Sequence, residues 1–506
     1  MVAPATWIGF GTMCVGMFMA VLDVQVVATS LPTIQDALTI EPDQMSWIQT
    51  AYLVAEVIAI PLTGFLTRVL SMRWLFVSSI AIFTFASAQC ANSGNFADLI
   101  LWRVLQGFSA GTLIPAVFTA VFLLFPVQRQ GIATTLAGAL AVLAPTLGPV
   151  VGGWITDTYS WRWLFLINVV PGIFSTLVGA LTLPRSPARL GEIRKLDIAS
   201  LISMATALAA LEIALKKAPQ LGWTTGPPLA FLVVYLASGS YFIQRTLRAR
   251  HPVVDLRHFS DPDFVVGCIL SFVLGMGLFG SVYLMPVFLA FVRAHDALEI
   301  GEIMLVTGIA QLLVAPFAVA LEQRVETRLL TAIGFVMFGI GLGLSGWQTP
   351  RTDYAEMFWP QVVRGSAIMF CLLPPTRMAL GHLDEGRVPD ASGLFNLMRN
   401  LGGAIGLALI DTVIYGRAPV IGATILSRLQ AGDANTAKFV GIPPDVFAKH
   451  LGAPLDPHLQ AALHALVDKA ARVQAMNEAW DMLALFTFAA LIGVPFAKRI
   501  RRHQSA

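Results

Sequence analysis

Residues 7–31 read WIGFGTMCVGMFMAVLDVQVVATSL, an apolar run that carries one charged side chain, Asp23. At about 1.5 Å of rise per residue, a helix of this length crosses the hydrocarbon core of a bilayer. No Lys or Arg precedes the run, so the basic region that begins a secretory signal peptide is missing. The run therefore predicts a retained transmembrane helix, with a carboxylate at a depth where charge is costly.

The rest of the chain repeats this pattern. Hydrophobic residues make up 56% of the 506 residues and charged residues only 12%, whereas soluble domains carry about 25% charged residues. Such a chain cannot cover its surface in water, so we expect an all-α membrane protein with about fourteen transmembrane helices. The predicted spans are 7–32, 46–67, 73–91, 97–125, 131–156, 161–184, 197–215, 223–245, 262–292, 299–321, 328–347, 354–380, 389–415 and 478–497.

The basic residues of the short loops indicate how these spans are oriented. With both termini in the cytoplasm, most Lys and Arg residues fall in cytoplasmic loops and in the C-terminal tail. The loop 32–45, which is then external, contains none. This orientation places the long segment 416–477 outside, where the charge rule does not apply because long loops cross regardless of charge.

Two pairs of spans echo each other and divide the chain. The fourth span reads Arg103-Val-Leu-Gln-Gly and the twelfth reads Gln361-Val-Val-Arg-Gly, each with a proline further on. The fifth and thirteenth share a Leu-Gly motif that begins at Leu147 and at Leu401. Parallel repeats of this kind build one class of transporter from two bundles. We expect six-helix bundles in 1–184 and 257–506, with two inserted helices in 185–256.

Three charged side chains inside the first bundle are the main functional candidates. Asp23, Glu56 and Arg103 fall within about one helical turn of the same depth. Desolvation favours a protonated carboxylate and a neighbouring arginine favours an ionised one, so such a carboxylate can take up a proton and release it again. The alternative is a buried ion pair that only positions helices. Glu56 shares a helix face with Tyr52 and Gln49, which either lines a cavity or binds a neighbouring helix.

The fifth predicted span has an unusual spacing of small residues and prolines. Small side chains every three or four residues allow helices to approach closely, and prolines interrupt the backbone hydrogen bonds and allow bending. We expect either a hinge at the interface of the two bundles or tight packing alone. The residues concerned are Pro145, Gly148, Pro149, Gly152 and Gly153.

Several classes of function are excluded by what the sequence lacks. No G-x-x-x-x-G-K-[ST] loop, no H-E-x-x-H site and no G-x-S-x-G elbow in a strand context is present, so no enzyme activity is expected. The four cysteines lie in apolar runs without metal-ligand spacing, so neither a metal nor a cofactor is expected. The net charge of +3 is spread over short loops, which argues against nucleic-acid binding.

Four motifs occur in the same order along nearly the whole chain as in one known family. They are Leu22-Asp23-Val-Gln-Val-Val-Ala-Thr-Ser-Leu-Pro32, Arg103-x-x-Gln106-Gly107, Gly148-Pro149-x-x-Gly152-Gly153 and Ala391-Ser-Gly-Leu-Phe-Asn396-Leu-Met-Arg399-Asn-Leu-Gly402-Gly403. With them the chain resembles the fourteen-helix drug:proton antiporters of the major facilitator superfamily, of the EmrB/QacA type. The resemblance implies that Asp23 and Arg103 take part in proton coupling and that the third motif is the antiporter motif.

One loop departs from the superfamily pattern. Arg68 and Ser71 stand where that pattern has an aspartate and a glycine, and EmrB-like members also carry a basic residue at the first of these positions. The chain therefore resembles the EmrB-like side of the branch. That implies a pump of the bacterial inner membrane, which works with a periplasmic adaptor (membrane fusion) protein and an outer-membrane channel.

Together these observations predict a proton-coupled multidrug exporter for hydrophobic or amphiphilic compounds, with the proton as coupling ion. An exporter of one specific metabolite and a membrane sensor or scaffold without turnover are the alternatives. Arg364 and Arg399 are either internal braces or part of the cavity. The residues expected to line the substrate cavity are Gln25, Gln49, Tyr52, Gln106, Arg364, Asn396 and Arg399.

The segment 416–477 is too long for a simple connection between helices, since most run about 2–8 residues. Apolar residues recur with helical spacing from Leu459 to Val473, so this part predicts an amphipathic arm that needs a cover. The cover is either the other arm of a hairpin or the adaptor protein.

Overall fold

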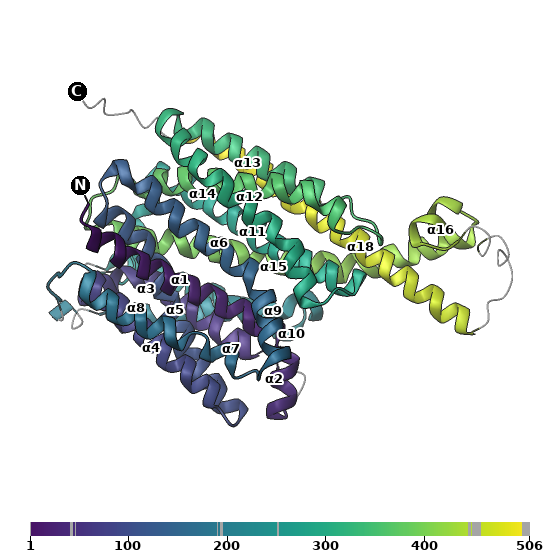
Figure 1. Cartoon of the computed structure of the whole chain (residues 1–506), viewed down its shortest axis with the longest axis horizontal. Helices are drawn as coiled ribbons and strands as arrows, with labels where there is room; N and C mark the ends of the chain where they lie inside the picture. The colour runs from purple at the N-terminus through teal and green to yellow at the C-terminus, as the bar shows by residue number, and fades with distance from the viewer. Residues whose placement is uncertain are drawn as a thin grey trace.

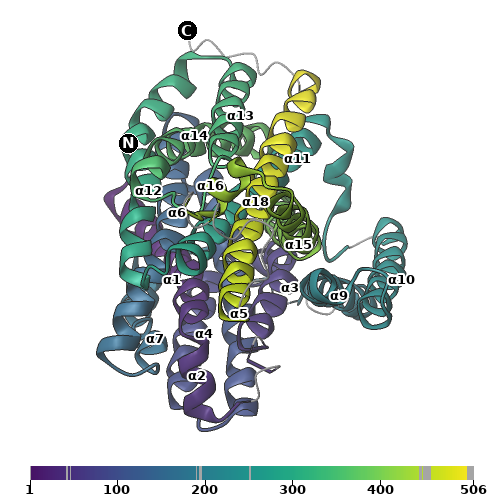
Figure 2. The ribbon, with the colours of Figure 1, turned by 90° about the vertical axis from the view of Figure 1, so that its right-hand side faces the viewer.

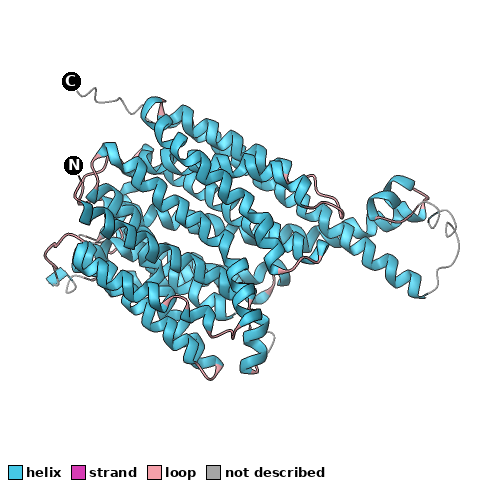
Figure 3. Cartoon of the chain, viewed as in Figure 1, coloured by secondary structure: helices cyan, strands magenta, loops and turns pink. Residues whose placement is uncertain are grey.

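The computed structural model describes residues 2–40, 44–45, 47–189, 191–192, 196–249, 252–443, 447 and 457–497. Within these ranges helices are the only regular secondary structure, and most of them run nearly parallel to one long axis (Figure 3). The predicted all-α class is confirmed.

The N-terminal bundle encloses the fully buried side chains of Phe10, Phe76 and Phe118. Its helices are α1 (Pro4–Thr29), α2 (Leu31–Leu38), α3 (Trp47–Leu70), α4 (Met72–Asn92), α5 (Phe96–Leu124), α6 (Val127–Thr158), α7 (Trp163–Leu166) and α8 (Val169–Thr182).

Two helices follow that stand beside the bundles. α9 (Ile198–Leu221) packs against α3 and α15, and α10 (Gly226–Arg248) packs mainly against α9. Figure 2 shows this pair at one side of the molecule. Large apolar side chains of α10, among them Val233 and Leu236, are exposed. In a bilayer these side chains face lipid.

The C-terminal bundle has its own core, which contains Phe288, Phe335, Phe338 and Trp480. Its elements are α11 (Pro262–Phe288), which a π-turn continues over Leu289–Arg293, α12 (Ala297–Arg324), α13 (Thr327–Leu344), α14 (Tyr354–Leu380), α15 (Val388–Gln430), α16 (Ala434–Val440), α18 (Pro457–Ala490) and the 3-10 turn Leu491–Phe496.

The two bundles meet along two seams, one between α6 and α12 and one between α3 and α15. The first is so close that a Cβ on Gly301 of α12 would lie 1.6 Å from Val150 Cγ2 of α6. At the second, Arg68 of α3 pairs with Asp390 of α15. Arg68 thus forms an ion pair between the bundles at the position where the superfamily pattern has an acidic residue.

Thirteen of the fourteen predicted spans each fall on one helix, and the sixth falls on two short ones, α7 and α8. Among the described residues, twelve helices are long and apolar enough to cross a membrane, and α6, whose two parts are inclined at 44°, raises the number to thirteen. α14 is 27 residues long but is less apolar, because it contains three prolines and the buried Arg364. It occupies the place of the twelfth predicted span.

One predicted span is interrupted, and another ends later than predicted. The sixth span is broken into α7 and α8 around Asn168, near Pro171, which lacks a backbone donor. The thirteenth span does not end near residue 415: α15 continues to Gln430, and α18 begins at Pro457. These two helices project from the bundle and carry α16 near their tip, at the end opposite to the start of α1 (Figure 1).

We call residues 416–440 and 457–477 the hairpin. Its two arms share an apolar core that includes Ile425, Leu429 and Val467. At its base Arg417 Nε donates to Glu478 Oε2 at 2.7 Å. The two arms therefore cover each other's apolar side chains, which was one of the two predicted alternatives.

Candidate functional site

Asp23 and Arg103 form an ion pair inside the N-terminal bundle. Arg103 Nη1 of α5 lies 2.5 Å from Asp23 Oδ2 of α1, and both side chains are fully buried. Arg103 Nε also donates to the carbonyl oxygen of Ile48 at 3.0 Å. The two charges predicted to lie at one depth are therefore in direct contact.

Two amides hold the other oxygen of the same carboxylate. Gln106 Nε2 and Asn168 Nδ2 donate to Asp23 Oδ1 at 2.9 and 2.8 Å. Gln106 also donates to Ser87 Oγ of α4 at 2.8 Å. The buried carboxylate thus accepts hydrogen bonds from α5 and from the break between α7 and α8.

Asn168 was not among the predicted site residues. It lies in the break between α7 and α8, where the chain leaves helical hydrogen bonding and its side chain can reach α1. Its signal in the sequence is an amide in an apolar run three residues before Pro171. Ser87 was missed as well, because a serine in a membrane helix usually bonds to its own backbone.

Helix α3 contacts the Asp23–Arg103 ion pair through Tyr52. The Tyr52 ring lies 4.3 Å from the Arg103 guanidinium carbon, and its hydroxyl donates to the Ala20 carbonyl at 2.9 Å. A Cβ on Gly107 would come within 2.2 Å of the Tyr52 carbonyl oxygen, so only glycine permits this approach of α5 and α3.

Glu56 lies one turn further along α3 than Tyr52 and is 7% exposed. The Glu56 carboxylate interacts electrostatically with Glu212 of α9, Arg103 and Asp23. It is the second buried carboxylate of this bundle and faces toward the inserted helix. Gln49, on the same face, is half-buried.

The predicted hinge motif lies on α6, between α1 and α12. Pro145 is buried and Gly148 faces Gln25 of α1. The 44° inclination separates Val127–Pro145 from Val150–Thr156. Gly152 accepts a hydrogen bond from Thr156 through its carbonyl, Gly153 is half-buried, and the side chain of Pro149 lies outside the described part.

We expect Gly148→Ala to destabilise the contact of α1 with α6. The added Cβ would lie 2.3 Å from Gln25 Cβ, and overpacking of this kind costs about 1–3 kcal/mol. The melting temperature of the purified protein should fall. Gly11→Ala on α1 is the matched control, because nothing lies within 4 Å of its added Cβ. Equal melting temperatures for both variants would contradict the close approach.

The arginines of the C-terminal half lie apart from the Asp23 pair. Arg399 of α15 donates to Asn396, which in turn donates to the Ser392 carbonyl at 2.9 Å, and its guanidinium lies over the Phe118 ring of α5. Arg399 thus faces the N-terminal bundle and is bonded to Asn396 of its own helix, whereas Arg364 lies inside the C-terminal bundle.

A charged cluster ties three helix ends together at the hairpin end of the molecule. Asp353, at the start of α14, accepts from Arg293 Nη2 at 2.6 Å and contacts His295 Nε2 at 3.0 Å. His295 Nδ1 lies 2.8 Å from Glu299 of α12. The hydrogen bond to Asp353 raises the pKa of His295 above its ordinary value of 6.5.

This cluster should make stability depend on pH. A group whose folded pKa is raised stabilises the fold fully below its unfolded pKa, and the contribution is lost as pH rises through the folded value. We expect His295→Gln to lower the melting temperature more at about pH 5.5 than at about pH 9. The exposed His464→Gln is the control. A deficit for His295→Gln that is the same at both pH values would contradict the assignment.

Among the residues that the structure describes, no group of three or more His, Cys, Asp or Glu side chains could hold a metal ion. The structure has two helix bundles with apolar side chains on their outer surface. The N-terminal bundle contains the buried, hydrogen-bonded carboxylate of Asp23. These features are typical of a multi-pass membrane transporter.

The chain belongs to the Major Facilitator Superfamily, whose family model matches residues 13–407. It is 39% identical over 412 residues to the "Colistin resistance protein EmrB" of Acinetobacter baumannii, which covers 81% of this chain and 80% of that protein. It is 31% identical over 420 residues to the "Multidrug export protein EmrB" of Escherichia coli K12, covering 83% and 82%. The EmrB-type resemblance is confirmed.

The fold agrees with this family. The human organic anion transporter MFSD10 superposes with a TM-score of 0.62 at 14% identity, over 97% of this chain and 100% of that one. At this identity the likeness concerns the fold alone.

Proposed function

We propose that this protein exports hydrophobic or amphiphilic compounds in exchange for protons, by alternating access between its two bundles. The observation that carries the proposal is the Asp23 carboxylate, buried in a membrane helix with one arginine and two amides as partners. Protonation of Asp23 would release Arg103 from its ion pair. The names of the EmrB relatives support drug-like compounds as substrates.

The second carboxylate fits the same proposal. Glu56 lies next to the Asp23 pair, and a negative charge there would favour cationic amphiphiles in the cavity. The seam helices α6 and α12 would move against each other during the cycle, and the ion pair Arg68–Asp390 would hold one end closed.

The test is transport of ethidium by the protein in everted membrane vesicles. Acidifying the vesicle interior should drive ethidium uptake, and collapse of the pH gradient with nigericin should stop it. A sensor without turnover would bind ethidium in these vesicles without accumulating it. Ethidium accumulation that persists after the pH gradient collapses would overturn proton coupling while leaving export intact.

We further propose that the hairpin end faces the periplasm of a bacterial inner membrane and that both termini are cytoplasmic. A periplasmic adaptor, itself linked to an outer-membrane channel, would then dock on the hairpin. Because the arms cover their own apolar core, docking would use exposed side chains such as Val420 and Leu466.

Replacing residues 420–470 with a short Gly/Ser linker should therefore separate two activities. Ethidium transport in vesicles should persist, since the hairpin lies outside the bundles. Resistance of whole cells and capture of a co-expressed adaptor should be lost. Capture of the adaptor at full affinity by the shortened protein would contradict the docking proposal.

A further inference from the structure

Arg364 of α14 has surroundings that repeat those of Arg103 of α5. An aromatic ring stacks on each guanidinium carbon, Trp480 at 5.3 Å and Tyr52 at 4.3 Å. Gly365, which follows Arg364, lies as close to a neighbouring helix backbone as Gly107 does. A Cβ on Gly365 would lie 2.4 Å from the Thr307 carbonyl oxygen. The two halves thus hold one arginine centre each.

The two centres differ in the partner of the arginine. Arg103 pairs with the carboxylate of Asp23, whereas Arg364 Nη2 contacts Met285 Sδ of α11 at 3.5 Å. Within the part of the chain that the structure describes, no carboxylate pairs with Arg364, which is only 3% exposed. A buried cation without a counter-charge is costly, so we expect a negatively charged group to bind beside Arg364.

The contacts that Arg364 does make are long. Nη1 lies 3.5 Å from Ser345 Oγ and Nη2 lies 3.3 Å from Thr307 Oγ1, beyond the usual range of about 2.7–3.2 Å for N–H donors. Its Nε atom is buried and has no hydrogen-bond partner. The donors of this guanidinium are therefore largely unused.

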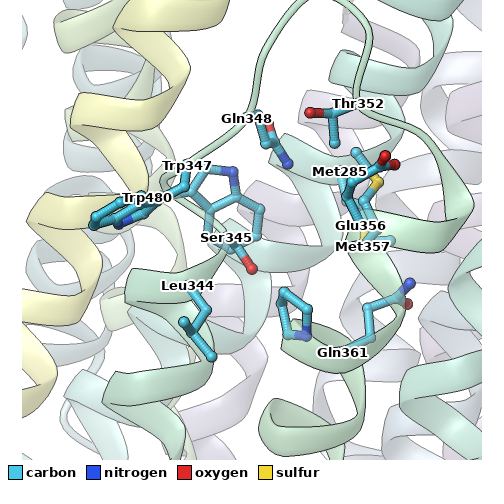
Figure 4. Close-up of a pocket in the computed structure, with 11 residues that line it drawn as sticks. Met285, Leu344, Ser345, Trp347, Gln348, Thr352, Glu356, Met357, Gln361 and Trp480 are labelled. Carbon is cyan, nitrogen blue, oxygen red and sulfur yellow. The ribbon is translucent and has the colours of Figure 1, made fainter.

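A pocket lies directly against this centre. Met285, Ser345 and Trp480 each contact Arg364 and also line the pocket (Figure 4). The cavity measures about 30 Å³, whereas about 10–15 Å³ on the same measure is enough for one water molecule. It has room for a compact polar group and not for a whole drug molecule.

Two side-chain N–H donors that line this pocket have no hydrogen-bond partner. Trp480 Nε1 and Gln361 Nε2 are buried and have no hydrogen-bond partner, like Arg364 Nε. Trp480 is 0% and Gln361 1% exposed. Gln348 Oε1 is also unpartnered, and its amide can turn to present its NH₂ group instead. Two buried N–H groups beside a guanidinium whose own Nε–H has no partner call for an anionic acceptor.

We propose that this pocket binds the carboxylate group of a small or amphiphilic monocarboxylic acid, with Arg364 as its counter-charge. Glu356 at the rim is exposed and accepts a hydrogen bond from the Asp353 backbone. Its negative charge disfavours ligands with two charges, which selects monoanions. The tail of a longer acid would extend toward the hairpin end. This site lies outside the Asp23 pair, so it does not depend on proton coupling.

The test is equilibrium binding of radiolabelled acetate and octanoate to the purified full-length protein in detergent, at constant ionic strength with chloride as competitor. We expect saturable binding of both acids. Trp480→Phe keeps the ring over Arg364 and removes one charge-assisted donor, so it should weaken binding about tenfold. Trp359→Phe, on α14, is the control: its side chain is 67% exposed and does not line the pocket, so this variant should bind like the unmodified protein.

A second variant supplies the missing carboxylate from the protein. Met285→Glu would place a carboxylate beside the Arg364 guanidinium, so it should raise the melting temperature and abolish binding of added acetate. The proposal is overturned if the unmodified protein binds neither acid saturably, if it binds chloride alone, or if neither variant changes carboxylate binding.

Discussion

Asp23→Asn is expected to reduce proton-driven export to the level of cells that lack the protein. The amide keeps the size of the side chain and can still accept hydrogen bonds from Gln106 and Asn168, but it cannot take up or release a proton. Each transport cycle would then lose its coupling step. Ethidium efflux from cells, corrected for the amount of protein in the membrane, measures this effect.

The control for this variant is Asp36→Asn. Asp36 lies on α2 and is exposed, so the same change of charge occurs there without touching the buried pair. Efflux by this control should equal that of the unmodified protein. Normal efflux by Asp23→Asn at normal membrane levels would remove Asp23 from the coupling mechanism.

The second large effect is expected for Arg103→Gln. Removing the guanidinium leaves a buried carboxylate without its counter-charge, and breaking a buried ion pair from one side costs about 3–5 kcal/mol. The variant should therefore show a strongly lowered melting temperature as well as no export. The double variant Asp23→Asn/Arg103→Gln contains no buried charge at this place and should recover most of the lost stability.

The double variant also decides between the two interpretations of the ion pair. If the pair only braces α1 against α5, a neutral pair that restores stability should restore export too. If Asp23 carries the proton, the double variant should be stable and inactive. Export by the double variant at half or more of the normal rate would contradict the coupling role.

Much of this architecture could be predicted from the sequence, because the bilayer imposes a simple length rule on apolar segments. The same rule predicted the meeting of Asp23 and Arg103, since depth along a helix follows from counting residues. The packing role of Gly107 and Gly148 also follows from the sequence: glycine occurs where two backbones approach.

Other features depend on contacts that no local pattern contains. Asn168 reaches Asp23 only because the helix breaks before Pro171, and the position of a break depends on tertiary packing. The partner of Arg68, Asp390, lies 322 residues away in the chain and belongs to the other bundle. The length of α15 was underestimated because an amphipathic helix in water continues where the apolar run of a membrane span ends.

The most direct test of the central claim is proton movement driven by a substrate gradient. The protein is reconstituted into liposomes that contain a pH-sensitive dye, and ethidium is added outside, with protein-free liposomes as the blank. An exchanger that imports ethidium must export protons, so the interior pH should rise above the blank with the unmodified protein and stay at the blank with Asp23→Asn. Ethidium entry through the unmodified protein without any change in interior pH would contradict proton-coupled export.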